Sequence, residues 1–238
     1  MTDALPDEIL RISDLHAFYG ESHILHGIDL SVRKGEVITL LGRNGSGRTT
    51  TLKAILGLVG RRTGSIVFNG RETIRMPTHR IARLGIGYCP EERGIFASLD
   101  VGENLMLPPQ LRSGGMTNEQ IYKMMPNLEE RKRSMGSRLS GGEQQMLAMA
   151  RILRTGANLL LLDEITEGLA PVIVKALGNV IRELKQHGYT IVLVEQNFRF
   201  AAPLADRHYI LEHGTIADLI PMQELDSSMN RINKYLSV

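Results

Sequence analysis

The sequence lacks several features that mark particular classes of protein. Cys89 is the only cysteine among 238 residues, which excludes an internal disulfide and fits a reducing compartment. The formal net charge is only +2, so bulk electrostatics requires neither nucleic acid nor anionic lipid as a partner. The first ten residues include Asp3, Asp7 and Glu8 but no apolar core, so we expect no export signal. The apolar run at 159–162 is far too short to span a bilayer, and any role at a membrane would depend on a partner protein.

The composition and the apolar patterning indicate a globular α/β protein. With 42% hydrophobic and 23% charged residues, the chain is typical of one domain, or of one domain with an inserted subdomain. Residues 10–18 and 24–32 alternate apolar and polar side chains and predict antiparallel strands. Residues 158–164 and 190–195 are continuous apolar runs, which predict parallel strands buried between helices.

A helical region interrupts this pattern. Residues 96–137 differ in composition from the flanking chain and contain helical patterns at 101–107 and 117–125. We interpret this region as an inserted helical subdomain. Four of its methionines are Met116, Met124, Met125 and Met135, and we expect them either to pack in the core of small helices or to form an adaptable docking surface. The basic run 131–133 is expected on a solvated helical face, and 221–238 is expected to be a polar helical tail.

Residues 42–50 are the most informative stretch of the chain. They follow an apolar run and lead into a helical pattern, which is the strand, turn and helix context of a phosphate-binding loop. In the template G-x-x-x-x-G-K-[ST], Gly42, Gly47 and Thr49 are in register. Glycines let backbone N–H groups approach phosphate oxygens, the helix adds its positive end, and the Thr49 hydroxyl is placed to bind Mg²⁺. The candidate nucleotide-binding residues of the loop are Gly42, Arg43, Asn44, Gly45, Ser46, Gly47, Arg48, Thr49 and Thr50.

One position of the loop departs from the template, because Arg48 occupies the lysine slot. Arginine retains the positive charge, but its guanidinium is a broad planar fork where the loop usually holds a slim ammonium group. We therefore predict nucleotide binding and leave the capacity for hydrolysis open. If the loop is considered alone, the alternative is a glycine-rich turn that binds no ligand. The motifs further along the chain make this alternative negligible.

Polar side chains follow three of the predicted strands. Asp163 and Glu164 end one apolar run, and Glu91 and Gln196 follow two others. Ligands gather beyond the carboxyl ends of parallel strands, so we expect Mg²⁺ or its water at Thr49, Glu91 and Asp163. Glu164 is suited to polarise an attacking water. The plainer interpretations are an acidic turn at 163–164 and a solvated carboxylate at position 91.

Two further features are candidates for nucleotide contact. Ser140 is a suitable helix N-cap, with Glu143 three residues later as in a capping box. Gly141 and Gly142 are costly inside a helix, so we expect a group such as a phosphate to approach the backbone there. The ring of Tyr19 could stack on a nucleobase or be a packed surface tyrosine.

The motifs and their order resemble an ATP-binding cassette (ABC) ATPase, and the resemblance covers nearly the whole chain. Residues 42–50 resemble the Walker A loop, and 139–143 resemble the signature sequence. Residues 159–163 resemble the Walker B strand, and Glu164 matches the catalytic glutamate that follows it. A phosphate loop followed by LSGGE and LLLLDE is a very specific combination.

The other motif positions also have counterparts, with two departures. Tyr19 is similar to the adenine-stacking aromatic, Glu91 lies at the Q-loop position, and Gln196 lies at the switch-histidine position. Ile165 replaces the usual proline, and Arg48 replaces the lysine that normally bridges the β- and γ-phosphates. The catalytic residues that the resemblance implies are Glu164, Gln196 and Arg48.

A closer resemblance is to the ATP-binding subunits of branched-chain amino-acid importers. Pro90-Glu91 replaces the common Pro-Gln of the wider family, and Val-Glu-Gln at 194–196 replaces the common switch histidine. Residues 139–147 and 167–171 are also similar to that subfamily. Urea and amide importers share much of this pattern, so the transported solute stays open.

The resemblance implies one nucleotide-binding domain over residues 1–238. Its P-loop NTPase (RecA-like) core, a mostly parallel sheet with N-terminal antiparallel strands, would comprise about 1–95 and 155–220. The helical subdomain would comprise about 96–154, and the helical tail at the C-terminus would comprise about 221–238. The seven histidines and single cysteine show no metal-ligand spacing.

The mechanism that the resemblance implies is a head-to-tail pair of cassettes with ATP and Mg²⁺ between them. The loop of one cassette and the segment 140–143 of the other would hold ATP; binding closes the pair and hydrolysis reopens it. The implied partners are a second cassette, identical or different, two integral-membrane permease subunits and, indirectly, a periplasmic solute-binding protein, without nucleic acid. The expected location is peripheral, at the cytoplasmic face of the inner membrane.

The sequence leaves three functional hypotheses open. The first is an active importer ATPase. The second is a nucleotide-binding cassette whose hydrolysis is impaired at Arg48 and which is paired with an active paralogue. The third is a soluble cassette ATPase for repair or translation, although such proteins usually carry two cassettes or large insertions.

Overall fold

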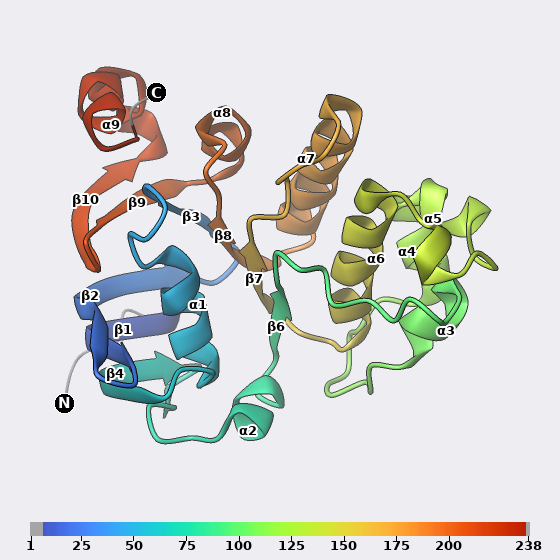
Figure 1. Ribbon diagram of the computed structural model, residues 1–238, viewed down its shortest axis with the longest axis horizontal. Coiled ribbons are helices and arrows are strands. Elements are labelled where there is room, and N and C mark those ends of the chain that lie inside the picture. Colours follow the sequence, from blue (N-terminus) through green and yellow to red (C-terminus); the bar gives the residue numbers. More distant parts are fainter. Residues whose placement is uncertain (1–6, 237–238) are drawn as a thin grey trace.

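The computed structural model describes residues 7–236 and contains two β-sheets with a group of helices beside them (Figure 1). One sheet is antiparallel and has the strand order β2-β1-β4-β5. Its strands are β1 (Glu8–Tyr19), β2 (Ser22–Arg33), β4 (Arg61–Phe68) and β5 (Arg71–Glu72). The two alternating segments near the N-terminus therefore pair as antiparallel strands, as predicted.

The second sheet is mostly parallel and has the order β10-β9-β3-β8-β7-β6. Five strands run parallel, and β10 pairs antiparallel with β9 at one edge. The strands are β3 (Val37–Leu41), β6 (Ile86–Cys89), β7 (Leu159–Asp163), β8 (Thr190–Val194), β9 (Arg207–Glu212) and β10 (Thr215–Pro221). Every residue of β3, β7 and β8 is buried, which confirms the prediction from the continuous apolar runs.

Helices cover both faces of this sheet and divide the apolar interior into two cores. Alternate residues of β7 pack into the two cores, because successive side chains of a strand point to opposite faces. Leu159 and Leu161 pack with α1 (Arg48–Leu56) and the antiparallel sheet. Leu160 and Leu162 pack with α7 (Pro171–Gln186) and the other helices on the opposite face.

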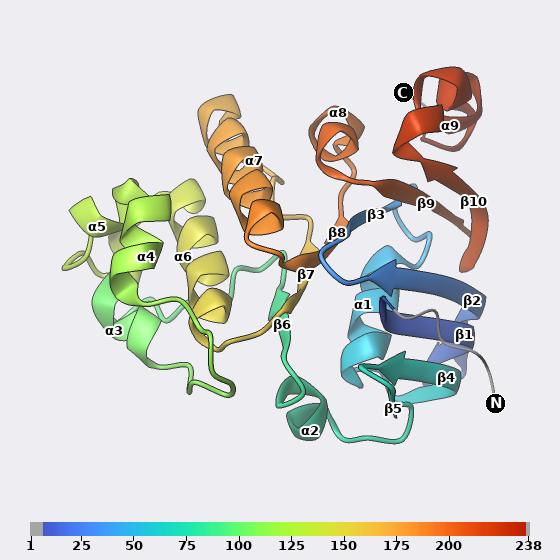
Figure 2. The ribbon, with the colours of Figure 1, turned by 180° about the vertical axis from the view of Figure 1, so that it is seen from behind.

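The helical region predicted around residues 96–137 is present beside α7, as both ribbon views show (Figures 1 and 2). The remaining helices are α2 (Thr78–Ala82), α3 (Val101–Met106), α4 (Asn118–Met124), α5 (Pro126–Glu130), α6 (Gly141–Arg154), α8 (Phe198–Ala201) and α9 (Met229–Leu236). Single 3₁₀ turns are η1 (Gly136–Arg138), η2 (Ala202–Leu204), η3 (Met222–Glu224) and η4 (Asp226–Ser228). None of the helices between residues 7 and 236 has the length and apolar character needed to cross a membrane. The boundaries of a helical subdomain at 96–154 stay a prediction.

Two details of this region show how context decides local structure. Met116 and Met125 are buried in the core, whereas Met135 is 38% exposed, so the methionines divide between core and surface. The prediction of a helical face at 131–133 was wrong, because α5 ends at Glu130 and these residues form an exposed turn. Pro126 starts a new short helix there, and a helix of five residues leaves too little periodicity to be recognised.

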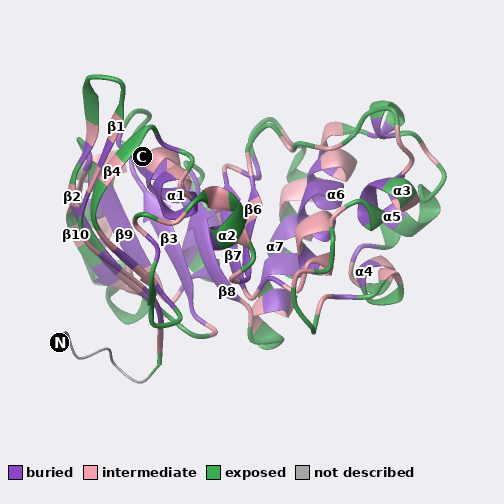
Figure 3. Cartoon of the chain, turned by 90° about the horizontal axis from the view of Figure 1, so that it is seen from below, coloured by how far each residue is buried: buried purple, intermediate pink, exposed green. Residues whose placement is uncertain are grey.

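A first prediction concerns β7, whose burial is visible in Figure 3. Leu161→Ala should lower the free energy of unfolding by about 2–5 kcal/mol, because it removes a fully buried side chain and leaves a cavity. The control is Leu58→Ala, since Leu58 is 48% exposed and its loss should change stability by about 0.5 kcal/mol or less. Urea denaturation of both variants measures the difference, and equal effects would contradict the assigned core.

Candidate functional site

A cavity of about 480 Å³ lies where the parallel strands end and α1 begins. Segments distant in the sequence meet there: the loop after β3, the ends of β7 and β8, and the residue after β6 (Figure 1). The residues that line it are Tyr19, Ile24, Asn44, Gly45, Ser46, Gly47, Arg48, Thr49, Thr50, Glu91, Glu164, Glu167 and Gln196. Most of the residues singled out in the sequence are therefore brought together around one opening.

The loop between β3 and α1 has the conformation of an anion cradle. Gly45 and Gly47 adopt positive φ angles of 77° and 105°, which glycine tolerates best. Within residues 7–236, the backbone N–H groups of these two glycines donate no hydrogen bond, whereas Ser46 N–H donates to Arg43 O at 3.1 Å. The Ser46 hydroxyl oxygen is buried and also has no partner in this part of the chain. Open donors at a helix N-terminus fit a phosphate group.

The side chain of Arg48 is bonded within the protein. It is only 4% exposed, and its guanidinium donates to Glu195 O at 2.9 Å, to Glu164 Oε1 at 2.8 Å and to Asn44 Oδ1 at 3.3 Å. Desolvation lowers the pKa of Arg48, and the carboxylate of Glu164 partly offsets this; a guanidinium nevertheless stays charged in a protein. Contact between this charge and a phosphate would therefore require the bonds to Glu164 and Asn44 to open.

Glu164 and Gln196 are hydrogen-bonded to each other at the same cavity. Glu164 follows β7 with a φ of 47°, which is uncommon for a residue with a side chain. Its N–H donates to Val194 O at 2.9 Å, and its Oε2 accepts from Gln196 Nε2 at 2.8 Å. The carboxylate is thus held from two sides, by Gln196 and by Arg48.

Thr49 and Asp163 lie next to each other, as a shared cation site requires. Thr49 Oγ1 donates to Asp163 Oδ1 at 2.9 Å, and the Tyr88 hydroxyl donates to Asp163 Oδ2 at 3.0 Å. Burial raises the pKa of Asp163, and the bonds from Thr49 and Tyr88 act in the opposite direction. Asp163 is 1% exposed and does not itself line the cavity, whereas Thr49 does. A carboxylate beside a hydroxyl offers the oxygen ligands that Mg²⁺ prefers.

Glu91 lies with a different set of carboxylates. One oxygen each of Glu91, Glu164 and Glu167 lies within 4.8 Å of the other two. The pKa of Glu167 is raised because its carboxyl group hydrogen-bonds to Glu164 and because the two like charges repel. Binding of a proton or a cation reduces the electrostatic repulsion within such a cluster. The combination of Thr49, Glu91 and Asp163 in one Mg²⁺ site stays a prediction.

Other predicted residues lie at the margin of the cavity or away from it. Tyr19 lines the cavity and is 42% exposed. Gly42 and Arg43 do not line it; a Cβ on Gly42 would collide with Leu211 O, so a glycine is required there for packing. Arg43 borders a smaller cavity of about 140 Å³, which Tyr235 of the C-terminal helix also lines.

The signature-like segment does not contribute to the lining of this cavity. Ser140 and Glu143 form the predicted capping box, with the Ser140 hydroxyl accepting from Glu143 N–H at 3.3 Å. The close approach expected at the glycines is made by this chain itself: a Cβ on Gly142 would lie 2.6 Å from the side chain of Ile173, and one on Gly141 would lie 3.1 Å from Arg93. Within the described chain, residues 140–143 do not line the cavity. A nucleotide contact there would need a second molecule.

Three residues at the site were not singled out from the sequence. Glu167 begins the subfamily-like segment 167–171, but nothing in the sequence assigns its carboxylate to the site. Tyr88 lies inside a short strand, and only the fold places its hydroxyl on Asp163. Glu195 is 2% exposed and accepts from Thr166 N–H at 3.1 Å and from the Thr166 hydroxyl at 2.8 Å. A polar residue that continues a buried apolar run was the available signal for Glu195.

A second prediction follows from Glu195. Burial raises its pKa from the ordinary 4.5 to about 7. Between these values the unfolded chain loses a proton that the folded chain keeps, so stability falls as pH rises from about 4.5 to 7. In Glu195→Gln, Oε1 can still accept from Thr166 N–H, and Nε2 can donate to the Thr166 hydroxyl oxygen. The variant should therefore remove a loss of the order of 3 kcal/mol over this range. Urea unfolding of both proteins at pH 5 and pH 8 measures the difference, and parallel pH profiles would contradict the prediction.

Together the fold and the cavity define a P-loop nucleotide-binding protein, because a strand, a glycine-rich loop and a helix N-terminus face carboxylates on neighbouring strand ends. The chain belongs to the ABC transporter family, whose model matches residues 25–167. Within that family it is an ATPase cassette.

Curated relatives resemble the chain over most of its length. BraG of Pseudomonas aeruginosa, a high-affinity branched-chain amino acid transport ATP-binding protein, is 39% identical over 87% of this chain and 91% of its own. LivF of Archaeoglobus fulgidus, a probable branched-chain amino acid transport ATP-binding protein, is 37% identical over 88% and 90%. LptB of Escherichia coli, the ATP-binding protein of a lipopolysaccharide export system, is 33% identical over 86% and 87%.

Solved structures share the fold. An ATP-binding subunit of an ABC transporter superposes with a TM-score of 0.80 at 25% identity, covering 97% of this chain and 100% of the other. A dimeric ATP-binding cassette bound to ADP and Pi in a post-hydrolysis state gives a TM-score of 0.79 at 23% identity, covering 90% and 99%. The predicted fold class, a mostly parallel P-loop sheet with antiparallel N-terminal strands, is confirmed.

Proposed function

We propose that this chain hydrolyses ATP to drive an importer of branched-chain amino acids or related solutes such as amides or urea. The observation that carries the proposal is the similarity to BraG and LivF, which extends over nearly the whole chain. The loop and the carboxylates Glu91, Glu164 and Glu167 meet at one cavity, and all lie within the residues that match the family model. The similarity to LptB is lower, and the comparisons do not favour the alternative of a hydrolysis-impaired cassette with an active paralogue.

The cavity assigns a role to each group. The open N–H groups of Gly45 and Gly47 and the positive end of α1 would bind the ATP phosphates. The ring of Tyr19 would stack on the adenine. Glu164 would orient the attacking water and accept its proton, and Gln196 would contact the γ-phosphate and hold Glu164 in position.

The residues that would hold Mg²⁺ are Thr49, Glu91 and Asp163. The hydroxyl of Thr49 already contacts Asp163 at 2.9 Å, and Glu91 lines the same cavity. The ion would neutralise charge on the β- and γ-phosphates. Tyr88 holds the second carboxylate oxygen of Asp163 at 3.0 Å.

The proposal includes a second cassette. The segment 140–143 does not line the cavity of its own chain. Ser140, Gly141, Gly142 and Glu143 would instead meet a nucleotide held by another cassette. The γ-phosphate would then link two surfaces, and closure would depend on intact ATP. Two permease subunits and, indirectly, a periplasmic binding protein complete the assembly, with this chain peripheral on the cytoplasmic side of the membrane.

Affinity purification of the tagged chain from detergent-solubilised membranes tests this proposal. The expected result is stoichiometric recovery of two permease subunits, together with uptake of a branched-chain amino acid, an amide or urea that is lost when the chain is deleted. Recovery without any membrane protein would contradict it and would support a soluble cassette ATPase.

A further inference from the structure

The sequence spacing of the histidines shows no metal motif, but the fold gathers three of them on one face. His16 of β1 and His23 and His26 of β2 lie on the hairpin at the outer side of the antiparallel sheet. The ring of His23 is fixed between neighbours, stacked on Phe18 with centroids 4.2 Å apart and tilted on His26 at 4.0 Å. These side chains are therefore ordered by ring packing, although His23 and His26 are exposed.

The separation of two ring nitrogens is close to that of ligands on one metal ion. His16 Nδ1 and His23 Nε2 are 3.0 Å apart. Two imidazole nitrogens at about 2.0–2.1 Å from one tetrahedral ion lie roughly 3.3 Å from each other. A shift of a few tenths of an ångström would admit the ion, and such a shift is small for partly exposed side chains.

A carboxylate fixes the tautomer that a metal site needs. Asp14 Oδ1 lies 3.0 Å from His16 Nε2, and an ionised carboxylate only accepts. His16 therefore carries its proton on Nε2, and the lone pair of Nδ1 faces His23. His23 reaches the matching state by moving its proton to Nδ1, without a change in charge. A histidine that ligates a metal typically donates its other N–H to a carboxylate in this way.

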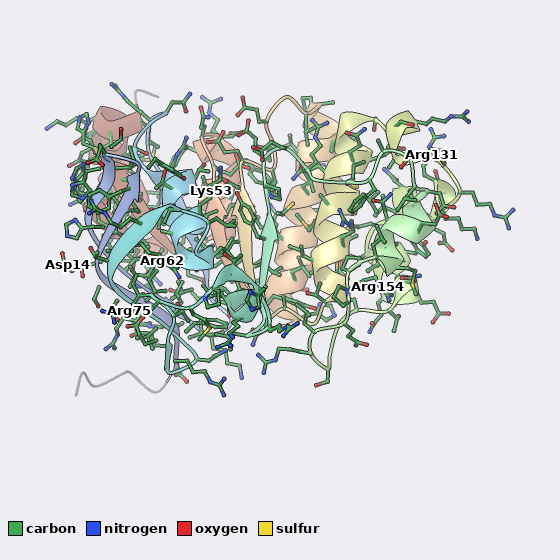
Figure 4. All side chains as sticks on the ribbon, turned by 60° about the horizontal axis from the view of Figure 1, so that its bottom comes forward. Asp14, Lys53, Arg62, Arg75, Arg131 and Arg154 are labelled. Carbon is green, nitrogen blue, oxygen red and sulfur yellow. The ribbon has the colours of Figure 1, made fainter. Side chains whose placement is uncertain are left out.

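The backbone is shaped around this pair. Asp14 has a φ of 47° and lies at an irregularity of the β1 pairing between Ile12 and Leu15, and such bulges redirect side chains. Its N–H donates to Asp29 Oδ1 at 3.0 Å. Gly27 of β2 leaves room for these side chains, because a Cβ at that position would lie 3.1 Å from Asp14 Oδ1 and 3.8 Å from the His16 ring. Figure 4 shows Asp14 at the outer edge of the sheet, where an ion from solvent has access.

We infer that His16 and His23 form a binding site for a divalent transition-metal ion that takes imidazole ligands, such as Zn²⁺, with Asp14 orienting His16. Water completes the coordination, because no third His, Cys, Asp or Glu of the described residues lies within ligand distance of both nitrogens. The site is separate from the carboxylates of the cavity and does not rest on the proposed function. Binding joins β1 to β2 near Tyr19 and raises the stability of the folded chain by mass action.

Isothermal titration of the tag-free chain with Zn²⁺, in excess Mg²⁺ to occupy the cavity carboxylates, tests the site. One Zn²⁺ per chain is expected. His16→Ala and His23→Ala should each weaken binding by more than about tenfold, and Asp14→Asn by about 10–100-fold, as for other groups that orient a ligand. His79→Ala is the matched control, because His79 is an exposed histidine on α2, and it should bind as the wild type does.

A second measurement keeps the test independent of folding. The electron paramagnetic resonance spectrum of the chain with one equivalent of Cu²⁺ should show coordination by imidazole nitrogen, and the nitrogen signal should be reduced in His23→Ala. Circular dichroism verifies that each variant is folded. Absence of saturable Zn²⁺ binding, or unchanged binding in folded His16→Ala and His23→Ala, would overturn the inference.

Discussion

Replacing Glu164 by glutamine is expected to lower ATP turnover by about 10²–10⁴-fold while the chain still binds ATP. The carboxylate lies at the end of β7, lines the cavity and is held by Gln196 at 2.8 Å. A glutamine of the same shape cannot accept the proton of the attacking water. Phosphate release from the assembled transporter measures the turnover, and fluorescence titration with a nucleotide analogue measures the binding.

The same variant carries a second, more specific expectation. In the structure Glu164 accepts from Arg48 at 2.8 Å, so the neutral amide should release the guanidinium and increase ATP affinity. The matched control is Glu224→Gln, an exposed glutamate in η3, which should leave both quantities unchanged. Turnover of Glu164→Gln within about tenfold of the wild type would remove Glu164 from the proposed role.

Replacing Arg48 by alanine should weaken ATP binding by about 10–100-fold, the effect of losing a hydrogen bond to a charged group. The guanidinium is the positive side chain in the lysine slot of the loop. In the structure it is directed to Glu164, Asn44 and Glu195 O. ATP phosphates would compete with these acceptors for the charge, so its removal should reduce affinity more than it reduces the maximal rate.

Arg48→Lys distinguishes the two cassette hypotheses. For an active importer ATPase, lysine should support turnover within a few-fold of the wild type, because the charge is retained and the ammonium group is the usual occupant of the slot. Turnover in the assembled transporter measures this. A large gain with lysine would contradict that view and would indicate a cassette whose hydrolysis is impaired by its own arginine. Unchanged ATP affinity in Arg48→Ala would show that this side chain never reaches the phosphates.

Much of the architecture could be predicted from the sequence because its signals are local. Continuous apolar runs identified β7 and β8, which are buried along their whole length. Alternation identified β1 and β2. The phosphate loop was recognised because its glycines, the preceding strand and the following helix are adjacent in the chain. Ser140 and Glu143 were recognised as a capping box for the same reason.

The parts that could not be predicted depend on distant contacts. Arg48 is bonded to Glu164, a residue 116 positions later, so its direction is invisible in a linear motif. Glu167 joins Glu91 only through the fold. The glycine at position 142 fits the side chain of Ile173, whereas the sequence alone gave no reason to choose between a neighbouring helix and a phosphate.

The histidine pair illustrates the same limit. His16 and His23 are seven residues apart, a spacing that matches no metal motif. Their nitrogens meet because β1 and β2 pair with Phe18 opposite His23 and with an irregularity at Asp14. Only the register of the hairpin makes them neighbours.

We propose that the cavity at 42–50 holds a nucleoside triphosphate together with Mg²⁺. Titration of the purified chain with ATP, in the presence of Mg²⁺ and again in the presence of a chelator, tests it most directly. Saturable binding below millimolar ATP is expected, and it should weaken when Mg²⁺ is removed or when Thr49 is replaced by alanine. Absence of Mg²⁺-dependent binding at millimolar ATP, both for the isolated chain and for the assembled transporter, would contradict it.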